Sequence, residues 1–507
     1  MTIKPRTYQF LVGVFASLGS FLFGYDLGVI GGVVASKAFV REFNDPNPNQ
    51  VGAVVSLFTG GAFFGALFAG PIGDWFGRRI VILIGAVMVC LGGGMQSGAR
   101  NIDYFYSGRA LAGLGVGFLV MIIPLYQAEI AHPLIRGRIT GLQQFMLGIG
   151  AAVAVWIAYG TNLHLASTDN NQWRIPLVIQ VVPAAVLALL ILLFPESPRW
   201  LIVNGKREEG LQTLAQLHSS NDQSDAWVRA EFEQIQEAIT FDQEHGAKGY
   251  KELFTNKSSF RRLVLTTALQ ASVQMTGVSA IQYFSPEIYK TINIGTTDAL
   301  KYQGISNVLS ILAQLCTILF IDRLGRRWPL ICGNLVNCVC FIIVTAAIAT
   351  FPSASPSRQT SLGWAFIVVN WIYQISFSFT CGSLSWIIPA EIFDTKTRSK
   401  GVSISVMVSF AFNTMIGQVT SPAINDISWR YFLVFVVCNF TNAVFFWAFM
   451  PETAKRPLEE MNILFSGSSW FVPTMKRDLF AVNDLEHRIQ EVIEKEIALN
   501  VENASNK

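Results

Sequence analysis

Long apolar runs, separated by short polar connections, dominate the pattern of the chain. A helix needs roughly 20 mostly apolar residues to cross a bilayer. Lipid offers backbone groups no hydrogen-bond partner, so such runs predict helices, and the alternating pattern of a membrane barrel is absent. The pattern predicts an all-α membrane protein with twelve transmembrane helices near residues 8–34, 52–70, 80–98, 103–125, 139–160, 175–194, 263–290, 304–321, 329–350, 362–388, 400–423 and 430–450.

Basic residues in the short connections predict the orientation of these helices. They cluster in alternate connections, and the connections between hold mostly one basic residue each. Positively charged loops stay in the cytosol, so we expect the clusters and both termini to be cytoplasmic. The clusters are Arg78 with Arg79, Arg136 with Arg138, Arg323 with Arg326 and Arg327, and Lys396 with Arg398 and Lys400.

One long polar insert, residues 195–262, interrupts the apolar pattern. Within it REEGLQTLAQL and WVRAEFEQIQEAI have apolar residues three or four apart, as amphipathic helices do. DLEHRIQEVIEKEIAL, close to the C-terminus, predicts a further, solvated helix. We therefore expect an N-terminal six-helix bundle (1–195), an intracellular helical domain (196–260), a C-terminal six-helix bundle (261–455) and a cytoplasmic tail (456–507).

Composition agrees with a membrane protein and excludes several other classes. The 507 residues are 51% hydrophobic and 14% charged, whereas a soluble domain carries about 25% charge. A net charge of +3 is too small and too dispersed to indicate nucleic-acid binding. The seven cysteines lie in apolar runs without metal-ligand spacing, so no metal and no cofactor is expected. The first run is too long for a signal peptide and is interpreted as a retained helix.

The chain contains an internal repeat. The first half contains three features in order: GPIGDWFGRR at 70–79, Glu129 seven residues before Arg136, and PES at 195–197. The second half contains matching features in the same order, about 250–260 residues later: FIDRLGRR at 320–327, Glu391 seven residues before Arg398, and PET at 451–453. Three features in one order indicate a duplicated unit.

These motifs, with PESPRWL at 195–201, resemble those of the sugar porter family of the major facilitator superfamily, over nearly the whole chain. The resemblance implies two pseudo-symmetric bundles and a network of charge-assisted pairs that stabilises the outward-open state. Simple anchoring of the topology is the alternative for any single residue. The implied network is Asp74, Arg78, Arg79, Glu129, Arg136, Asp322, Arg326, Arg327, Glu391 and Arg398.

Two ionisable residues stand out well inside predicted spans, because a charge near the bilayer centre costs at least about 2.5–3.5 kcal/mol. Asp26 and Arg109 both fall roughly 8–9 Å below the outer ends of their helices at about 1.5 Å per residue, so they could meet. In proton-driven members of the family the matching aspartate carries the proton and the matching arginine modulates it. Facilitators also keep the pair, so symport, facilitated diffusion and a purely structural ion pair all stay open.

Neutral amides and an indole in the later helices predict a sugar site. Sugars bind through neutral donors and acceptors, with an aromatic face for the ring. Buried amides need partners, so amides from several helices can line one wet cavity; packing between helices is the alternative for each one singly. The candidates are Gln144, Gln270, Gln274, Gln282, Trp386 and Asn413.

The family resemblance implies sugar contacts for Gln144, Gln270, Gln274, Trp386 and Asn413, and gating roles for the aromatics Tyr283 and Phe284. The chain also departs from the family pattern. Val273 replaces a glutamine, Ser279 and Ser310 replace asparagines, and Ser378 replaces an acid. Gln282 and the serines, including Ser279 as a candidate ligand, can rebuild the hydrogen-bond set for another sugar or a polyol.

The expected function is secondary active transport of a neutral monosaccharide by proton symport. Helices 5, 7, 8, 10 and 11 carry no Lys or Arg away from their ends, which favours a neutral solute over quinate or a sugar acid. Alternatives are a proton-independent facilitator of sugars or polyols, a quinate permease and a sugar sensor. No HExxH, GxSxG or GxxxxGK[ST] pattern indicates an enzyme. Expected partners are the solute, protons and the bilayer, for a monomer in the plasma membrane.

Overall fold

The computed structural model describes residues 5–131, 136–219, 221–245, 250–393, 397–453, 464–465 and 469–474. These residues form helices and their connections. The first part of the chain contains α1 (Pro5–Ala16), α2 (Leu18–Val34), α3 (Lys37–Glu42), α4 (Pro48–Phe76), α5 (Arg78–Ser97), α6 (Ile102–Ile130), α7 (Arg136–His164), α8 (Asn171–Leu190) and η1 (Ile191–Leu193).

The polar insert and the second part of the chain follow. They contain α9 (Pro198–Val203), α10 (Arg207–His218), α11 (Ala226–His245), α12 (Lys251–Thr255), α13 (Lys257–Gln274), α14 (Val278–Lys290), α15 (Thr296–Leu324), α16 (Arg327–Thr350), η2 (Phe351–Ser353), α17 (Pro356–Phe377), η3 (Ser378–Gly382), α18 (Ser383–Ile392), α19 (Arg398–Ile427), α20 (Arg430–Phe449) and η4 (Val472–Thr474).

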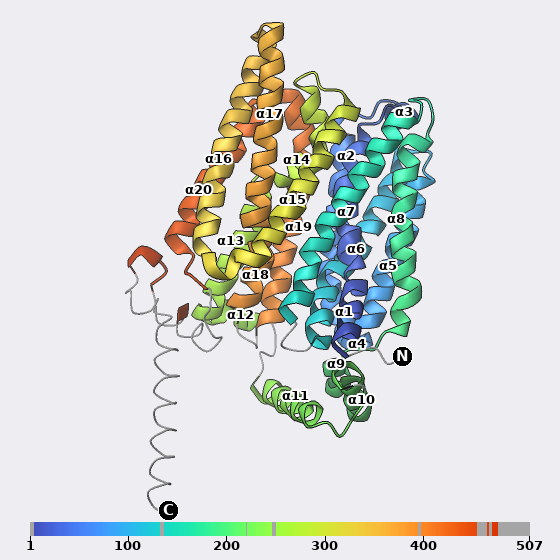
Figure 1. Ribbon diagram of the computed structural model, residues 1–507, viewed down its shortest axis with the longest axis vertical. Coiled ribbons are helices and arrows are strands. Elements are labelled where there is room, and N and C mark those ends of the chain that lie inside the picture. Colours follow the sequence, from blue (N-terminus) through green and yellow to red (C-terminus); the bar gives the residue numbers. More distant parts are fainter. Residues whose placement is uncertain are drawn as a thin grey trace, which may run out of the picture.

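The long helices stand side by side in two bundles, α1–α8 (the N half) and α13–α20 (the C half) (Figure 1). Within the described residues, ten helices are long and apolar enough to span a membrane. The broken pair α13–α14 and the 29-residue α15 occupy the two remaining predicted spans. Large apolar side chains on the bundle flanks, such as Leu189 at 76% and Leu193 at 77%, remain exposed, as expected for helices that face lipid.

The insert forms a small helical layer at one end of the bundles, below them in Figure 1. We call this end the insert end and the opposite one the far end. Helices α10 and α11 coincide with the two amphipathic segments, and Leu214 and Val228 form part of a core between them. Gln9 Nε2 donates to Leu217 O at 2.7 Å, which attaches the insert to α1. The predicted helix after residue 474 lies outside the described residues.

The seventh span is broken in its middle, where the sequence pattern predicts one helix. Helix α13 ends at Gln274 and α14 begins at Val278, after Gly277 in the left-handed conformation (φ 97°). The break frees the Thr276 carbonyl, which accepts hydrogen bonds from Asn439 Nδ2 at 3.1 Å and from the Tyr373 hydroxyl at 3.3 Å. A broken helix is tolerated at membrane depth because neighbouring helices satisfy the freed backbone groups in this way.

The two halves pack directly against each other towards the far end. Ser56 Oγ of α4 donates to Gln418 Oε1 of α19 at 2.7 Å. Asn307 Nδ2 of α15 donates to Ala151 O of α7 at 3.2 Å. Between α2 and α14 the backbones approach so closely that a Cβ on Gly31 would lie 2.7 Å from the backbone O of the α14 residue Tyr283. These contacts seal the interface between the halves on this side.

Candidate functional site

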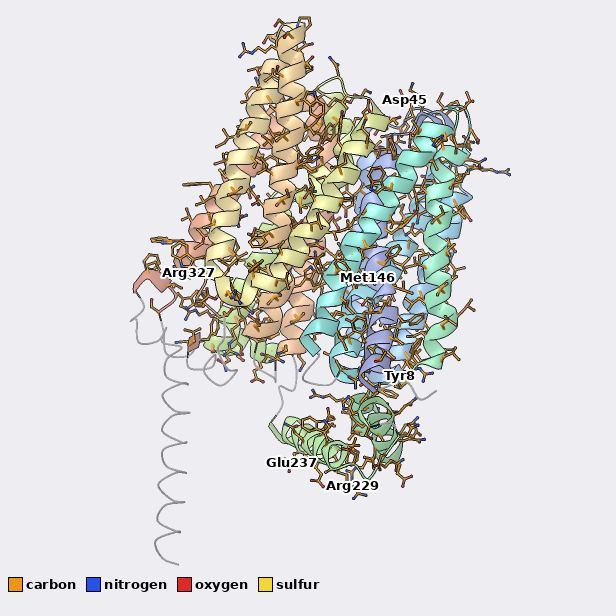
Figure 2. All side chains as sticks on the ribbon, in the orientation of Figure 1. Tyr8, Asp45, Met146, Arg229, Glu237 and Arg327 are labelled. Atoms are coloured by element: carbon orange, nitrogen blue, oxygen red, sulfur yellow. The ribbon has the colours of Figure 1, made fainter. Side chains whose placement is uncertain are left out.

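A polar cavity lies between the halves, at mid-height of the bundles. Its volume is about 100 Å³, several times the roughly 10–15 Å³ that one water needs. Met146, next to the lining residue Leu147, lies between the two ends marked by Asp45 and Tyr8 (Figure 2). All seven residues predicted to bind substrate line this one cavity: Gln144, Gln270, Gln274, Ser279, Gln282, Trp386 and Asn413.

Gln274 is the hydrogen-bonding centre of the C-half wall. Its Oε1 accepts from Ser279 Oγ at 2.5 Å and from Asn413 Nδ2 at 3.2 Å, and its Nε2 donates to Ser409 Oγ at 3.0 Å. The break after Gln274 brings Ser279 back to the same carboxamide, because α14 starts only four residues later. These contacts tie α13, α14 and α19 together at the cavity wall.

The other predicted ligands come from separate helices. Gln270, one turn before Gln274, donates from Nε2 to Ser385 O of α18 at 2.8 Å. Trp386, the next residue, is partly buried and lines the cavity. Gln144 reaches the cavity from α7, so it is the one predicted ligand that belongs to the N half. The assignment of sugar contacts to these residues stays a prediction.

The cavity also contains polar residues that sequence analysis missed. Asn307, Gln314 and Gln374 line it from α15 and α17, together with Ser409 of α19. A signal for two of them was present. Gln314 is four residues after Ser310, and Gln374 is four residues before Ser378, so each shares a helix face with a serine already singled out.

Asp26 and Arg109 meet inside the N half, beside the cavity and not among its lining residues. Arg109 Nη1 donates to Asp26 Oδ1, its Nε donates to Val54 O at 2.8 Å, and its guanidinium lies 4.4 Å over the Phe58 ring. Both charged side chains are fully buried. Asp26 Oδ2 has no hydrogen-bond partner within the part of the chain that the structure describes. The pair that the sequence suggested is therefore present, and its role in proton coupling stays a prediction.

The predicted gating aromatics lie on α14 at the seal between the halves. Tyr283 and Phe284 are both buried, at 0% and 1% exposure. Phe284 departs from helical geometry (φ −118°, ψ 21°), two residues before Pro286. Proline disrupts helical backbone bonding at such a point, so α14 is kinked here, next to the closed interface.

The charged motifs at the insert end form two matching sets, one in each half. Arg78 binds Glu129 through two hydrogen bonds of 2.9 and 3.1 Å, and Arg326 binds Glu391 through two of 3.3 and 2.8 Å. Asp74 adds a contact to Arg78 at 3.2 Å. The pairs named here each lie within one half.

The second arginine of each motif binds a backbone oxygen of its own half. Arg79 Nη2 donates to Leu192 O at 2.9 Å, and Arg327 Nη2 donates to Trp447 O at 2.6 Å. Arg398 contacts Phe393 O at 3.4 Å. The side chains of Arg136 and Asp322, also predicted for this network, lie outside the described residues.

Glu196 and Glu452, from PES and PET, complete the two sets, and their role was not predicted. Glu196 accepts from the backbone N–H groups of Arg78 and Arg79 at 3.1 and 3.2 Å. Glu452 accepts from those of Arg326 and Arg327 at 2.8 and 3.1 Å. Burial raises the pKa of Glu196, and its backbone hydrogen bonds offset part of that effect. The internal repeat of the sequence is thus matched by a repeat of contacts in the structure.

Comparison with known proteins decides the family. A protein-family sequence model described as "Sugar (and other) transporter" matches residues 12–465 of this chain. The chain belongs to the sugar (and other) transporter family. It is accordingly a multi-pass membrane transporter of the major facilitator superfamily and not an enzyme.

Two relatives and one solved structure illustrate how this family member compares. A quinate permease from Emericella nidulans is 33% identical over 90% of this chain and 88% of its own length. A glucose transporter from Aspergillus flavus is 29% identical over 97% of this chain and 95% of its own length. The E. coli proton:xylose symporter XylE has the same fold, with a TM-score of 0.75 over 91% of this chain and all of that one, at 24% identity.

Proposed function

We propose that this family member carries a neutral monosaccharide, a hexose or a pentose, by proton symport with alternating access. The observation that supports the substrate class best is the chemistry of the cavity wall. Eight lining residues are carboxamides, five are serines and one is Trp386, and no lining residue that the structure describes carries a charge. Such a wall can both donate to and accept from hydroxyl groups, and the indole can cover an apolar ring face.

The packing of the halves supports alternating access. The contacts between α4 and α19, α2 and α14, and α7 and α15 seal the interface towards the far end. At the insert end, Arg78 and Arg326 pair with carboxylates of their own halves. If the insert end faces the cytosol, this is a state closed to the outside, and rocking of the two halves around the cavity would open it.

The geometry of α2 supports coupling to protons. Phe23 and Leu27, four residues apart, line the cavity, and Asp26 of the same helix binds Arg109. A carboxyl that alternates between this pairing and protonation would change the local packing of α2. Solute binding and protonation of Asp26 would then affect each other through one helix. A facilitator without coupling is the alternative.

A hydroxy acid is the second candidate, because relatives named quinate permease align over most of the chain. A carboxylate in a dehydrated cavity needs a positive partner or several donors. Arg109 lies nearby and is already engaged by Asp26 and by Val54 O. The described cavity wall supplies amide, hydroxyl and indole donors and no positively charged partner, so the neutral solute is our proposal.

The test is a competition panel in cells that lack their own transporters. Uptake of labelled D-glucose and D-xylose is measured against unlabelled hexoses, pentoses, polyols and quinate, at several external pH values. We expect neutral sugars to compete and uptake to rise as external pH falls. Competition by quinate alone would contradict the substrate class, and uptake independent of pH would contradict coupling.

A further inference from the structure

Two carboxamides in the cavity wall are buried and yet have no hydrogen-bond partner among the described residues, whereas the other unpaired ones, Gln144 and Gln282, are only partly buried. Gln314 of α15 is 6% exposed and Gln374 of α17 is 3% exposed, and both line the cavity. Among the described residues, neither side chain forms a hydrogen bond, and Gln314 Oε1 is fully buried. Buried amides in proteins are nearly always hydrogen-bonded. A solute bound in the cavity that both residues line is a partner within reach of these side chains.

The contrast with the neighbouring amides is sharp. Gln270 is bound to Ser385 O, and both ends of the Gln274 carboxamide are engaged. The side chains of Gln270 and Gln274 therefore connect helices of the C half through hydrogen bonds. The carboxamides of Gln314 and Gln374, in contrast, form no such hydrogen bonds among the described residues. Burying an amide without hydrogen bonds is unfavourable.

The helix opposite Gln314 leaves space for the Gln314 carboxamide. A Cβ on Gly148 of α7 would lie 2.8 Å from Gln314 Oε1 and 3.2 Å from Ile311 Cγ1. Gly148 is one helical turn after Gln144, on the same face. The glycine therefore lets the carboxamide of Gln314 reach the boundary between the halves, where a bound solute would touch both.

From these observations we propose that Gln314 and Gln374 determine which solute is bound, by contacting its hydroxyl groups directly. The proposal rests on the proposed function, and it names the class of ligand more closely. A hydroxyl both donates and accepts, so it can satisfy the oxygen and the NH₂ group of a carboxamide. A carboxylate only accepts and leaves the carboxamide oxygen without a partner. The two amides thus select uncharged, hydroxyl-rich carbon skeletons.

The experiment uses the purified full chain in liposomes, with D-glucose, D-xylose and their monodeoxy derivatives as probes. Gln314→Leu and Gln374→Leu keep the side-chain volume and remove the polar atoms. We expect each to raise KM for the parent sugar by about tenfold or more, the effect of one lost buried hydrogen bond. For the derivative that lacks the contacting hydroxyl, KM of variant and unaltered protein should agree. A purely structural role would raise KM for parent and derivative alike.

Two further variants keep the result interpretable. Gln96→Leu removes a buried amide of the N half that donates to Gly108 O and does not line the cavity, and it should leave KM unchanged. Gly148→Ala should push the Gln314 carboxamide and raise KM for the same sugar. If the unaltered protein transports the probes while the Gln314 and Gln374 variants keep its KM and its pattern of derivative preference, the inference is wrong. If the unaltered protein transports no probe, the proposed function fails instead.

Discussion

The two halves are alike at the insert end and unlike inside the membrane. At the insert end Arg78, Glu129 and Glu196 make the same contacts as Arg326, Glu391 and Glu452. Within the bundles, the buried ion pair Asp26–Arg109 belongs to the N half. Of the six described N-half residues that line the cavity, Gln144 alone has a polar side chain, whereas most of the described C-half lining residues are polar.

This difference separates two tasks. Contacts that hold neighbouring helix ends together are needed by both halves, so duplication preserved them. Hydrogen bonding to a solute and exchange of a proton, the two tasks that we propose, need different chemistry, and the described residues suited to each are concentrated in one half. We therefore expect variants of the N-half interior to change coupling, variants of the C-half wall to change affinity, and variants of the repeated motifs to change stability in both halves.

The largest expected effect is that of Asp26→Asn on uphill transport. Asparagine cannot carry the proton, so a pH gradient of one unit, which could support roughly tenfold accumulation, should support none. Counterflow exchange should continue, because the cavity residues are unchanged, and it also shows that the variant is folded. The measurement is accumulation and exchange of labelled sugar in liposomes. Concentrative uptake by the variant would refute the assignment of coupling to the N half.

A smaller effect is expected from Gln274→Leu, compared with Gln144→Leu from the opposite wall. Gln274 has three hydrogen-bond contacts in the cavity wall, so its loss disturbs both the wall and the solute, and KM should rise by about 10- to 100-fold. Gln144→Leu should raise KM less. Both variants should keep the ratio of protons to sugar, measured with a pH electrode. A larger rise in KM for Gln144→Leu than for Gln274→Leu would contradict the proposed division of tasks between the halves. A changed ratio of protons to sugar in either variant would contradict it as well.

The smallest effects, and equal ones, are expected at the repeated glycines. Gly77 (φ 93°) and Gly325 (φ 80°) would place a Cβ 2.5 and 2.6 Å from the carboxylates of Glu196 and Glu452. Gly77→Ala and Gly325→Ala should each cost about 1–3 kcal/mol of stability. Gly205→Ala is the control for backbone strain alone, since Gly205 has φ 80° with nothing within 4 Å. Thermal unfolding in detergent measures all three, and an effect confined to one half would contradict the repeat of contacts.

The sequence predicted the helical membrane fold because each long apolar run has one stable arrangement in lipid. It also predicted that Asp26 and Arg109 could meet, because helix rise relates residue number to depth. It did not predict the break between α13 and α14, since Met275–Gly277 interrupts neither length nor hydropathy enough to end a span. It missed Gln314 and Gln374 as cavity residues, although each shares a helix face with a serine already singled out, because a shared face within one helix does not show that this face meets the other half.

By itself, then, the sequence determined the number of spans, the duplicated plan and the polar residue types available for a solute, because hydropathy and motif order are local properties of the chain. Tertiary structure alone decided which buried amides bind neighbouring helices and which line the cavity without partners, because that depends on side chains brought together from separate helices of both halves. It also decided that the seal lies towards the far end, because such contacts join residues hundreds of positions apart.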